Sequence, residues 1–187
     1  MTVEKLRKEL THVKALKASR VQYANIILTN ISLFPKLLDI IFMVNDTTSC
    51  KAAWVFELVC LENISILTPF LNRFTKNLNL IHLDSALRPV AKVCQHIANT
   101  YQNKQVNNTN PLLTSKHKNL IIEACFNWLI TPNKTATKVY AMETLFLLGD
   151  DLGWIHEELI LILKQNYQTE SAGYKARAKQ ILNKIRA

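Results

Sequence analysis

Glycine and proline are scarce in this sequence, which has only three glycines and five prolines among 187 residues. Because these two residues interrupt helices most strongly, their scarcity favours helices joined by short turns. With so few glycines, the sequence contains no GxGxxG, GxxxxGK[ST] or GxSxG motif. It therefore lacks both the glycine-rich loops that hold phosphate groups and the turn that exposes a hydrolase serine.

Long hydrophobic runs are also missing, because no apolar stretch approaches the roughly 18 to 20 residues that span a bilayer. The first ten residues, MTVEKLRKEL, are rich in charge and contain no apolar block of the kind found in signal peptides. We therefore predict a cytoplasmic protein with no membrane partner.

Residues that bind metals are few and scattered along the chain. The four cysteines form no CxxC pair, and the five histidines form no HExxH motif. Widely spaced cysteines in a cytoplasmic chain are typically reduced and buried. The sequence therefore implies no metal, no cofactor and no small-molecule substrate. The cysteines are Cys50, Cys60, Cys94 and Cys125.

The sequence does contain an internal repetition. CKAAWVFELVCLENISIL (50–67) and TKVYAMETLFLLGDDLGWI (137–155) align on Leu58 and Leu145, which places Lys51 and Lys138 seven residues earlier in each. Weaker copies align on residues 28, 93 and 182. Apart from one long gap, the copies lie 30 to 37 residues apart. This spacing is typical of two antiparallel helices with their turns.

The long gap contains a polar, asparagine-rich stretch at residues 102–111, which we interpret as a loop inserted into the repeat. Partner helices are predicted between the repeated ones, at 3–16, 34–44, 64–78, 114–130 and 153–165. The predicted fold is all-α: a single domain over 1–187 in which about five helix pairs stack into an α-α superhelix.

The repeated phrase resembles the second helix of HEAT repeats, with a basic residue near the helix start followed by small residues, alanine and leucine (138–145). That resemblance implies a HEAT/armadillo-like α-solenoid. The whole chain is also similar to a small bacterial family of single-domain proteins that is often labelled adenylosuccinate lyase. The serine-loop motif of that lyase, Ser-Ser-x-Met-Pro-x-Lys-x-Asn, does not occur here, so we do not carry over its activity.

Three glutamates lie inside apolar helical stretches, and each allows two interpretations. Glu57, Glu123 and Glu143 are either inward carboxylates for acid–base chemistry or partners of neighbouring bases. The second interpretation is preferred, because equivalent positions of a repeat usually share a structural role. Trp54 and Trp154 likewise either pack in the core or contact a partner.

The net charge of +9 gives the main indication of function. In an α-solenoid the second helices line one face, and a row of bases there would form a positive stripe. Alternatively, nearby acids neutralise the row: Asp46 with Lys51, Asp84 with Arg88, and Glu170 with Lys175. The candidate stripe consists of Arg20, Lys51, Arg88, Lys138, Lys175 and Arg177.

We predict a non-catalytic scaffold that binds a macromolecular partner, preferably an acidic protein surface, through the face lined by the second helices. The alternative is sequence-independent nucleic-acid binding in a basic groove. Phosphate binding weakens steeply with salt, whereas an interface with an apolar centre does not, so salt dependence distinguishes the two.

Overall fold

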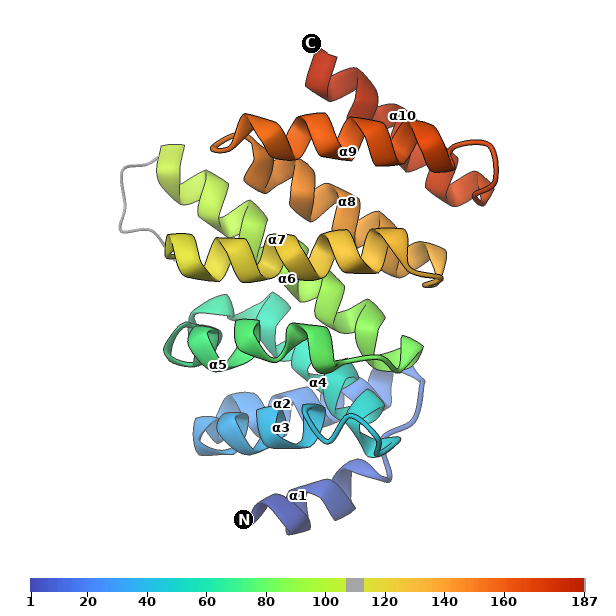
Figure 1. The fold of residues 1–187 in the computed structure, drawn as a ribbon. Coiled ribbons are helices and arrows are strands. Elements are labelled where there is room, and N and C mark those ends of the chain that lie inside the picture. The colour runs from blue at the N-terminus through green and yellow to red at the C-terminus, as the bar shows by residue number, and fades with distance from the viewer. Residues whose placement is uncertain (107–112, 187) are drawn as a thin grey trace. The chain divides into compact units, whose positions relative to one another are not determined.

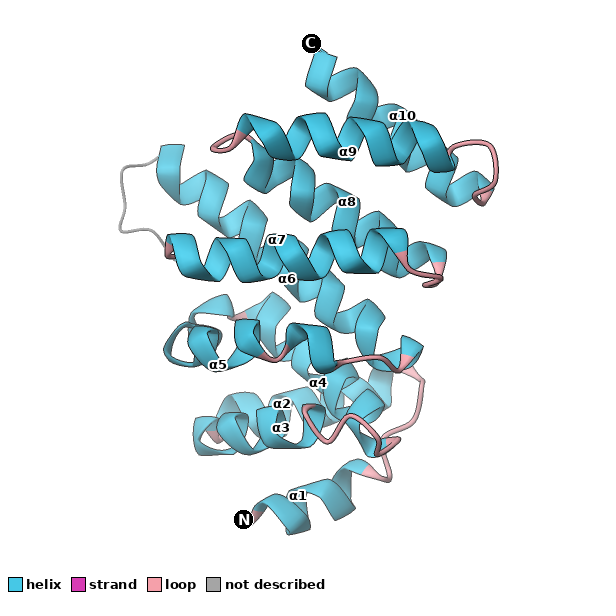
Figure 2. Cartoon of the chain, in the orientation of Figure 1, coloured by secondary structure: helices cyan, strands magenta, loops and turns pink. Residues whose placement is uncertain are grey.

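The computed structural model describes residues 1–106 and 113–186 (Figure 1). In these residues the chain forms ten α-helices, three short 3-10 segments and no strand (Figure 2). The predicted all-α class and the ten predicted helices are therefore confirmed. The chain divides into two compact units, Met1–Val93 and Cys94–Ala187, and helix α6 (Asp84–Val106) contributes to both.

The first unit is organised around helix α4, which packs against α1, α2 and α3. Its core contains an aromatic cluster in which Phe34, Phe56, Phe70 and Phe74 lie with ring centroids 5.4 to 5.9 Å apart. The helices are α1 (Val3–Leu10), α2 (Lys17–Thr29), α3 (Phe34–Ile41), α4 (Thr48–Glu62) and α5 (Leu71–Lys76). The 3-10 segments are η1 (Ile31–Leu33), η2 (Ile64–Phe70) and η3 (Leu78–Leu80).

The second unit is organised around α8, which packs against α7, α9 and α10. In Figure 1, α7 and α9 cross the front of this unit, while α8 and α10 lie behind them. Leu145, Leu148, Leu159, Leu163 and Tyr174 are fully buried in its core. The helices that follow α6 are α7 (Ser115–Ile130), α8 (Thr135–Gly149), α9 (Gly153–Asn166) and α10 (Ala172–Arg186).

The ends of several helices follow from capping residues. Thr2 accepts a hydrogen bond from the Lys5 amide at 3.2 Å and so begins α1. Thr114 begins α7 with a capping box, in which its hydroxyl accepts from the His117 amide and its own amide donates to His117 Nδ1. The expected helix over 64–78 is instead divided into η2, α5 and η3, because Pro69 has no amide hydrogen to donate.

The expected loop at 102–111 is wrong for residues 102–106, because α6 continues through Val106. Residues 102–106 are therefore helical. Gln102 holds this part of the helix in place, since its side-chain amide donates to the carbonyl oxygen of Leu147 on α8. The rest of the expected loop, 107–111, lies outside the described residues.

Candidate partner-binding site

Glu57 on α4 is an ion-pair partner, as its preferred interpretation required. Its side chain is 5% exposed and lies 2.7 Å from Arg88 Nη2 and 2.9 Å from Lys92 Nζ, both on α6. Placing two cations beside one buried carboxylate compensates for the loss of its hydration. Arg88, a member of the expected stripe, therefore forms its ion pair with a carboxylate on another helix of its own unit.

The second unit repeats this arrangement. Glu143 on α8 lies 3.1 Å from Arg177 Nη1 and 3.8 Å from Lys184 Nζ, both on α10. Lys138 is buried and pairs with Glu170, and its Nζ lies 6.0 Å from the centroid of the Tyr174 ring. Two further members of the expected stripe, Lys138 and Arg177, are thus neutralised by carboxylates.

The remaining stripe residues have other environments. Lys51 Nζ donates to the carbonyl oxygen of Thr11, and Lys175 Nζ donates to that of Gln168 at 3.1 Å. Arg20 is half-buried, and its Nε has no hydrogen-bond partner. Three of the six bases therefore pair with carboxylates, while Lys51 and Lys175 bond to uncharged backbone carbonyls and keep their positive charge.

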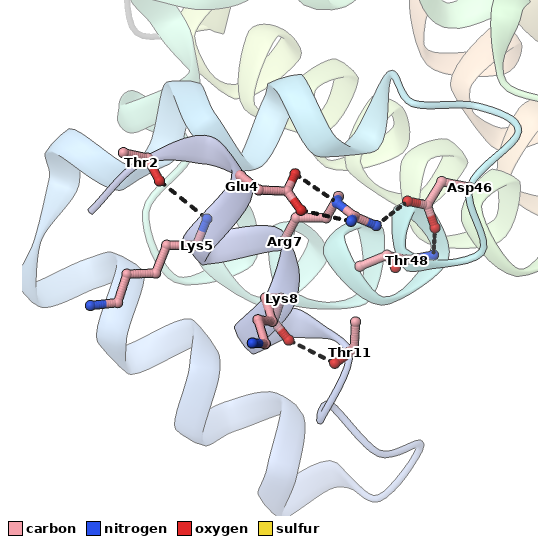
Figure 3. Close-up of polar contacts among 8 residues, drawn as sticks. All are labelled: Thr2, Glu4, Lys5, Arg7, Lys8, Thr11, Asp46 and Thr48. Atoms are coloured by element: carbon pink, nitrogen blue, oxygen red, sulfur yellow. Dashed lines mark hydrogen bonds and ion pairs between the residues drawn. The ribbon is translucent and has the colours of Figure 1, made fainter.

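The neutralising acids differ from those that the sequence suggested. Asp46 pairs with Arg7 at 2.9 Å rather than with Lys51, and Arg7 also binds Glu4 at 2.7 Å (Figure 3). The amide of Thr48 and the Arg7 guanidinium lower the pKa of Asp46. Glu170 likewise pairs with Lys138 rather than with Lys175. The expected pairs lie within one loop or helix start, whereas Arg7–Asp46 and Lys138–Glu170 join parts of the chain 39 and 32 residues apart.

Trp54 has a structural partner that the sequence analysis missed. Its indole Nε1 donates to the carbonyl oxygen of Ser85 at 2.9 Å. In a regular helix this carbonyl would accept from the amide four residues later, but that residue is Pro89. Trp54 therefore satisfies a carbonyl that proline leaves free, and the presence of a proline inside a helical stretch could have signalled the need for such a donor.

Trp154 is more exposed than any other tryptophan of the chain. It lies in the first turn of α9, is 54% exposed and stacks on Phe126 of α7 with ring centroids 6.1 Å apart. The two rings line a cavity of about 560 Å³ together with Ile122 and Leu152. Of the two predicted aromatic contacts, Trp154 is thus the more exposed, since Trp54 is half-buried.

The polar groups of this cavity, hereafter the Trp154 pocket, come from one face of α7. Asn119, Glu123 and Asn127 line it at helical spacing, beside the apolar Ile122 and Leu152. Glu123, unlike Glu57 and Glu143, is exposed. Phe126 was not singled out from the sequence, although an aromatic residue outside the apolar stripe of α7 could have indicated a surface role.

Among the described residues, the cysteines and His156 lie against other groups of the protein and do not form a metal site. All four cysteines are free thiols, and burial raises the pKa of Cys125 to about 12. His156 Nε2 lies 2.8 Å from the carbonyl oxygen of Phe146, on whose ring it stacks. Within residues 1–106 and 113–186, no three His, Cys, Asp or Glu side chains converge as a metal site would require.

No described helix is by itself long and apolar enough to cross a bilayer. Two pairs of consecutive segments, Lys17–Thr29 with Ile31–Ile41 and Thr48–Glu62 with Ile64–Lys76, reach that length and apolarity only together, across bends of 105° and 114°.

Comparison with other proteins yields no relative. The sequence matches no protein-family model, and no curated protein or solved structure is significantly similar to it.

Proposed function

We propose that this chain is a non-catalytic helical-repeat protein, an α-solenoid of the HEAT type, that binds a protein partner. The described residues form ten helices, the number that five pairs require, and each of the two compact units has its own buried core.

The sequence separation of the ion pairs supports the proposed helical repeat. Among the described residues, six hydrogen-bonded ion pairs join residues that lie 31 to 39 positions apart, which is close to one repeat length. In a solenoid each repeat contacts only its neighbours, so cross-links between elements recur at this separation. The pairs are Arg7–Asp46, Arg73–Asp39, Arg88–Glu57, Lys118–Asp151, Lys138–Glu170 and Arg177–Glu143.

The observation that carries partner binding is the Trp154 pocket. An exposed tryptophan stacked on a second ring, in a hollow lined by both apolar and polar side chains, has the composition of an interface hot spot. The pocket lies between α7 and the start of α9, which are the first helices of their pairs. The proposed contact is therefore on the first helices, whereas the sequence had suggested the second.

The net charge of +9 continues to favour an acidic partner. Long-range attraction would steer such a partner towards the protein, while the pocket would receive one of its apolar side chains. These two roles are separate, because charge mainly sets the association rate and a buried aromatic contact mainly sets the dissociation rate.

Sequence-independent nucleic-acid binding is the second candidate, and the same net charge favours it. The six stripe residues are poor candidates for phosphate contacts, because three of them already pair with carboxylates. Such binding would have to use the lysines and arginines that have no acidic partner, and it would weaken steeply between about 50 and 200 mM salt.

The test of the proposal compares three immobilised proteins: wild type, Trp154→Ala and Ile31→Ala. Ile31 is a matched control, because it is also apolar and is 50% exposed, but lies in the first unit. Proteins retained from an extract of the source cells are quantified by mass spectrometry, and the binding of each purified candidate is then measured by calorimetry.

We expect an acidic protein that binds wild type and Ile31→Ala equally and binds Trp154→Ala at least about tenfold more weakly, a loss of about 1.4 kcal/mol or more. If every protein retained by wild type binds Trp154→Ala with unchanged affinity, the Trp154 pocket is not the partner site.

A further inference from the structure

A second cavity, of about 420 Å³, lies in the second unit between the end of α9 and one face of α10. Three cations line it: Lys164 from the last turn of α9, and Lys179 and Arg186 from α10. Lys179 and Arg186 are seven residues apart, so both lie on the same face of α10, about 10 Å apart along its axis. This cavity is hereafter called the basic pocket.

Among the residues that the structure describes, no carboxylate neutralises the charge of the basic pocket. Glu170 is the only acid after Glu158, and it pairs with Lys138 on α8. The other bases of α10 are already engaged, since Arg177 and Lys184 pair with Glu143 and Lys175 binds a backbone carbonyl. Within the described residues, Lys164, Lys179 and Arg186 have no carboxylate partner, and no carboxylate lines the cavity.

The contrast with the rest of the protein is informative. Six arginines and lysines of the described residues, Arg177 of α10 among them, have hydrogen-bonded acids about one repeat away, whereas these three line one hollow without any. Like charges brought together repel one another unless an anion lies between them. Their convergence therefore indicates a site for an anion rather than a surface neutralised by the fold.

We propose that the basic pocket binds a compact ligand that carries two or more adjacent phosphate groups. Its volume is within the range of small-molecule sites. The guanidinium of Arg186 matches a phosphate group through paired donors, and the two ammonium groups supply point charges beside it. The ring of Tyr167 offers a surface for an aromatic or apolar body, and the amides of Gln168 and Asn183 offer further hydrogen bonds.

The competing explanation is a simple polar surface. Scattered lysines on the surface of α9 and α10 would keep this face soluble without any ligand. That explanation predicts weak, unselective attraction of anions, which would depend on the net charge of the whole protein rather than on the basic pocket.

Calorimetric titration of the whole chain with ATP and with inorganic tripolyphosphate, at about 50 mM salt, separates the two explanations. The test variant is Lys164→Glu with Lys179→Glu. The matched control is Lys5→Glu with Lys8→Glu, which changes the net charge equally on α1, where both lysines are exposed. Circular dichroism verifies that each variant keeps its helices.

We expect saturable binding of both probes by wild type and by the control, with affinities within about threefold of each other, and at least about tenfold weaker binding by the test variant. Absence of saturable binding by wild type, or equal weakening in both variants, would overturn the proposal. A short single-stranded RNA is the third probe. RNA binding that the test variant loses, without ATP or tripolyphosphate binding by wild type, would also overturn it and favour a nucleic-acid surface.

Discussion

Glu57 and Glu143 have the same role in the two units: each is a buried carboxylate that pairs with two basic side chains. Glu57 on α4 pairs with two bases of α6, and Glu143 on α8 pairs with two bases of α10. Aligning the two repeated phrases on Leu58 and Leu145 places Glu57 opposite Thr144. An alignment that matched the two glutamates would have to be shifted by one residue.

Replacing Glu57 by glutamine should destabilise the protein by about 1–3 kcal/mol, because Arg88 and Lys92 would lose their only carboxylate among the described residues. Urea unfolding monitored by circular dichroism measures this change. Glu62→Gln is the matched control on the same helix, where the side chain is exposed, and it should change stability by less than about 0.5 kcal/mol. Equal effects would show that the ion pair contributes nothing specific.

Trp54 and Pro89 are expected to be energetically coupled through the Ser85 carbonyl. Trp54→Phe removes the donor, which should cost about 0.5–1.5 kcal/mol beyond the loss of packing. With Pro89→Ala, the new amide at position 89 can bond to the same carbonyl, so Trp54→Phe should cost less in that background. A double-mutant cycle in urea measures the difference. Strict additivity of the two substitutions would contradict the proposed role of the indole.

The capping box at the start of α7, formed by Thr114 and His117, is sensitive to pH. His117 accepts a hydrogen bond at Nδ1 from the Thr114 amide, at 3.3 Å, and only a neutral ring can do so. Burial, with a smaller contribution from Lys116, lowers the pKa of His117 below 6.5. The unfolded chain therefore binds this proton more readily than the folded one.

The stability due to His117 should be complete above about pH 6.5 and should be lost as the pH falls from there through the lowered pKa. The slope from this one group is at most about 1.4 kcal/mol per pH unit. His117→Gln keeps a capping box that does not titrate, so its stability should decline less between about pH 7 and 5. Thermal unfolding at several pH values tests this, with the exposed His82→Gln as the control. Parallel profiles for wild type and His117→Gln would exclude the cap as the cause.

The helices were predictable because scarce breakers and apolar periodicity act locally. Thr114 and Pro132 bound their helices through interactions with residues a few positions away, so α7 was expected over 114–130 and observed as Ser115–Ile130. Segments with competing signals were less predictable. Pro69 interrupted the helix expected over 64–78, and polar residues after Gln102 concealed the continuation of α6.

The composition of the whole molecule gives the surplus of positive charge, but it does not predict which basic side chains have no acidic partner. Pairing depends on which helices meet, and Arg7 with Asp46 or Lys138 with Glu170 could not be matched by proximity in the sequence. The Trp154 pocket and the basic pocket were missed for the same reason, because each combines residues from separate elements.

The proposed repeat architecture predicts which parts of the chain should fold on their own. If each helix pair is stabilised mainly by its neighbours, then a run of consecutive pairs should fold without the rest of the chain. The two compact units with separate cores agree with this expectation, and α6 contributes to both. Each fragment should therefore include the whole of α6.

The most direct test is to unfold the fragments 1–106 and 84–187 in urea and to compare them with the full chain by circular dichroism. We expect both fragments to be helical and to unfold cooperatively, each with a lower midpoint than the full chain because each lacks neighbouring helices. If either fragment lacks helical structure and a cooperative transition, the protein is one globular fold with interdependent halves, and the helical-repeat account is contradicted.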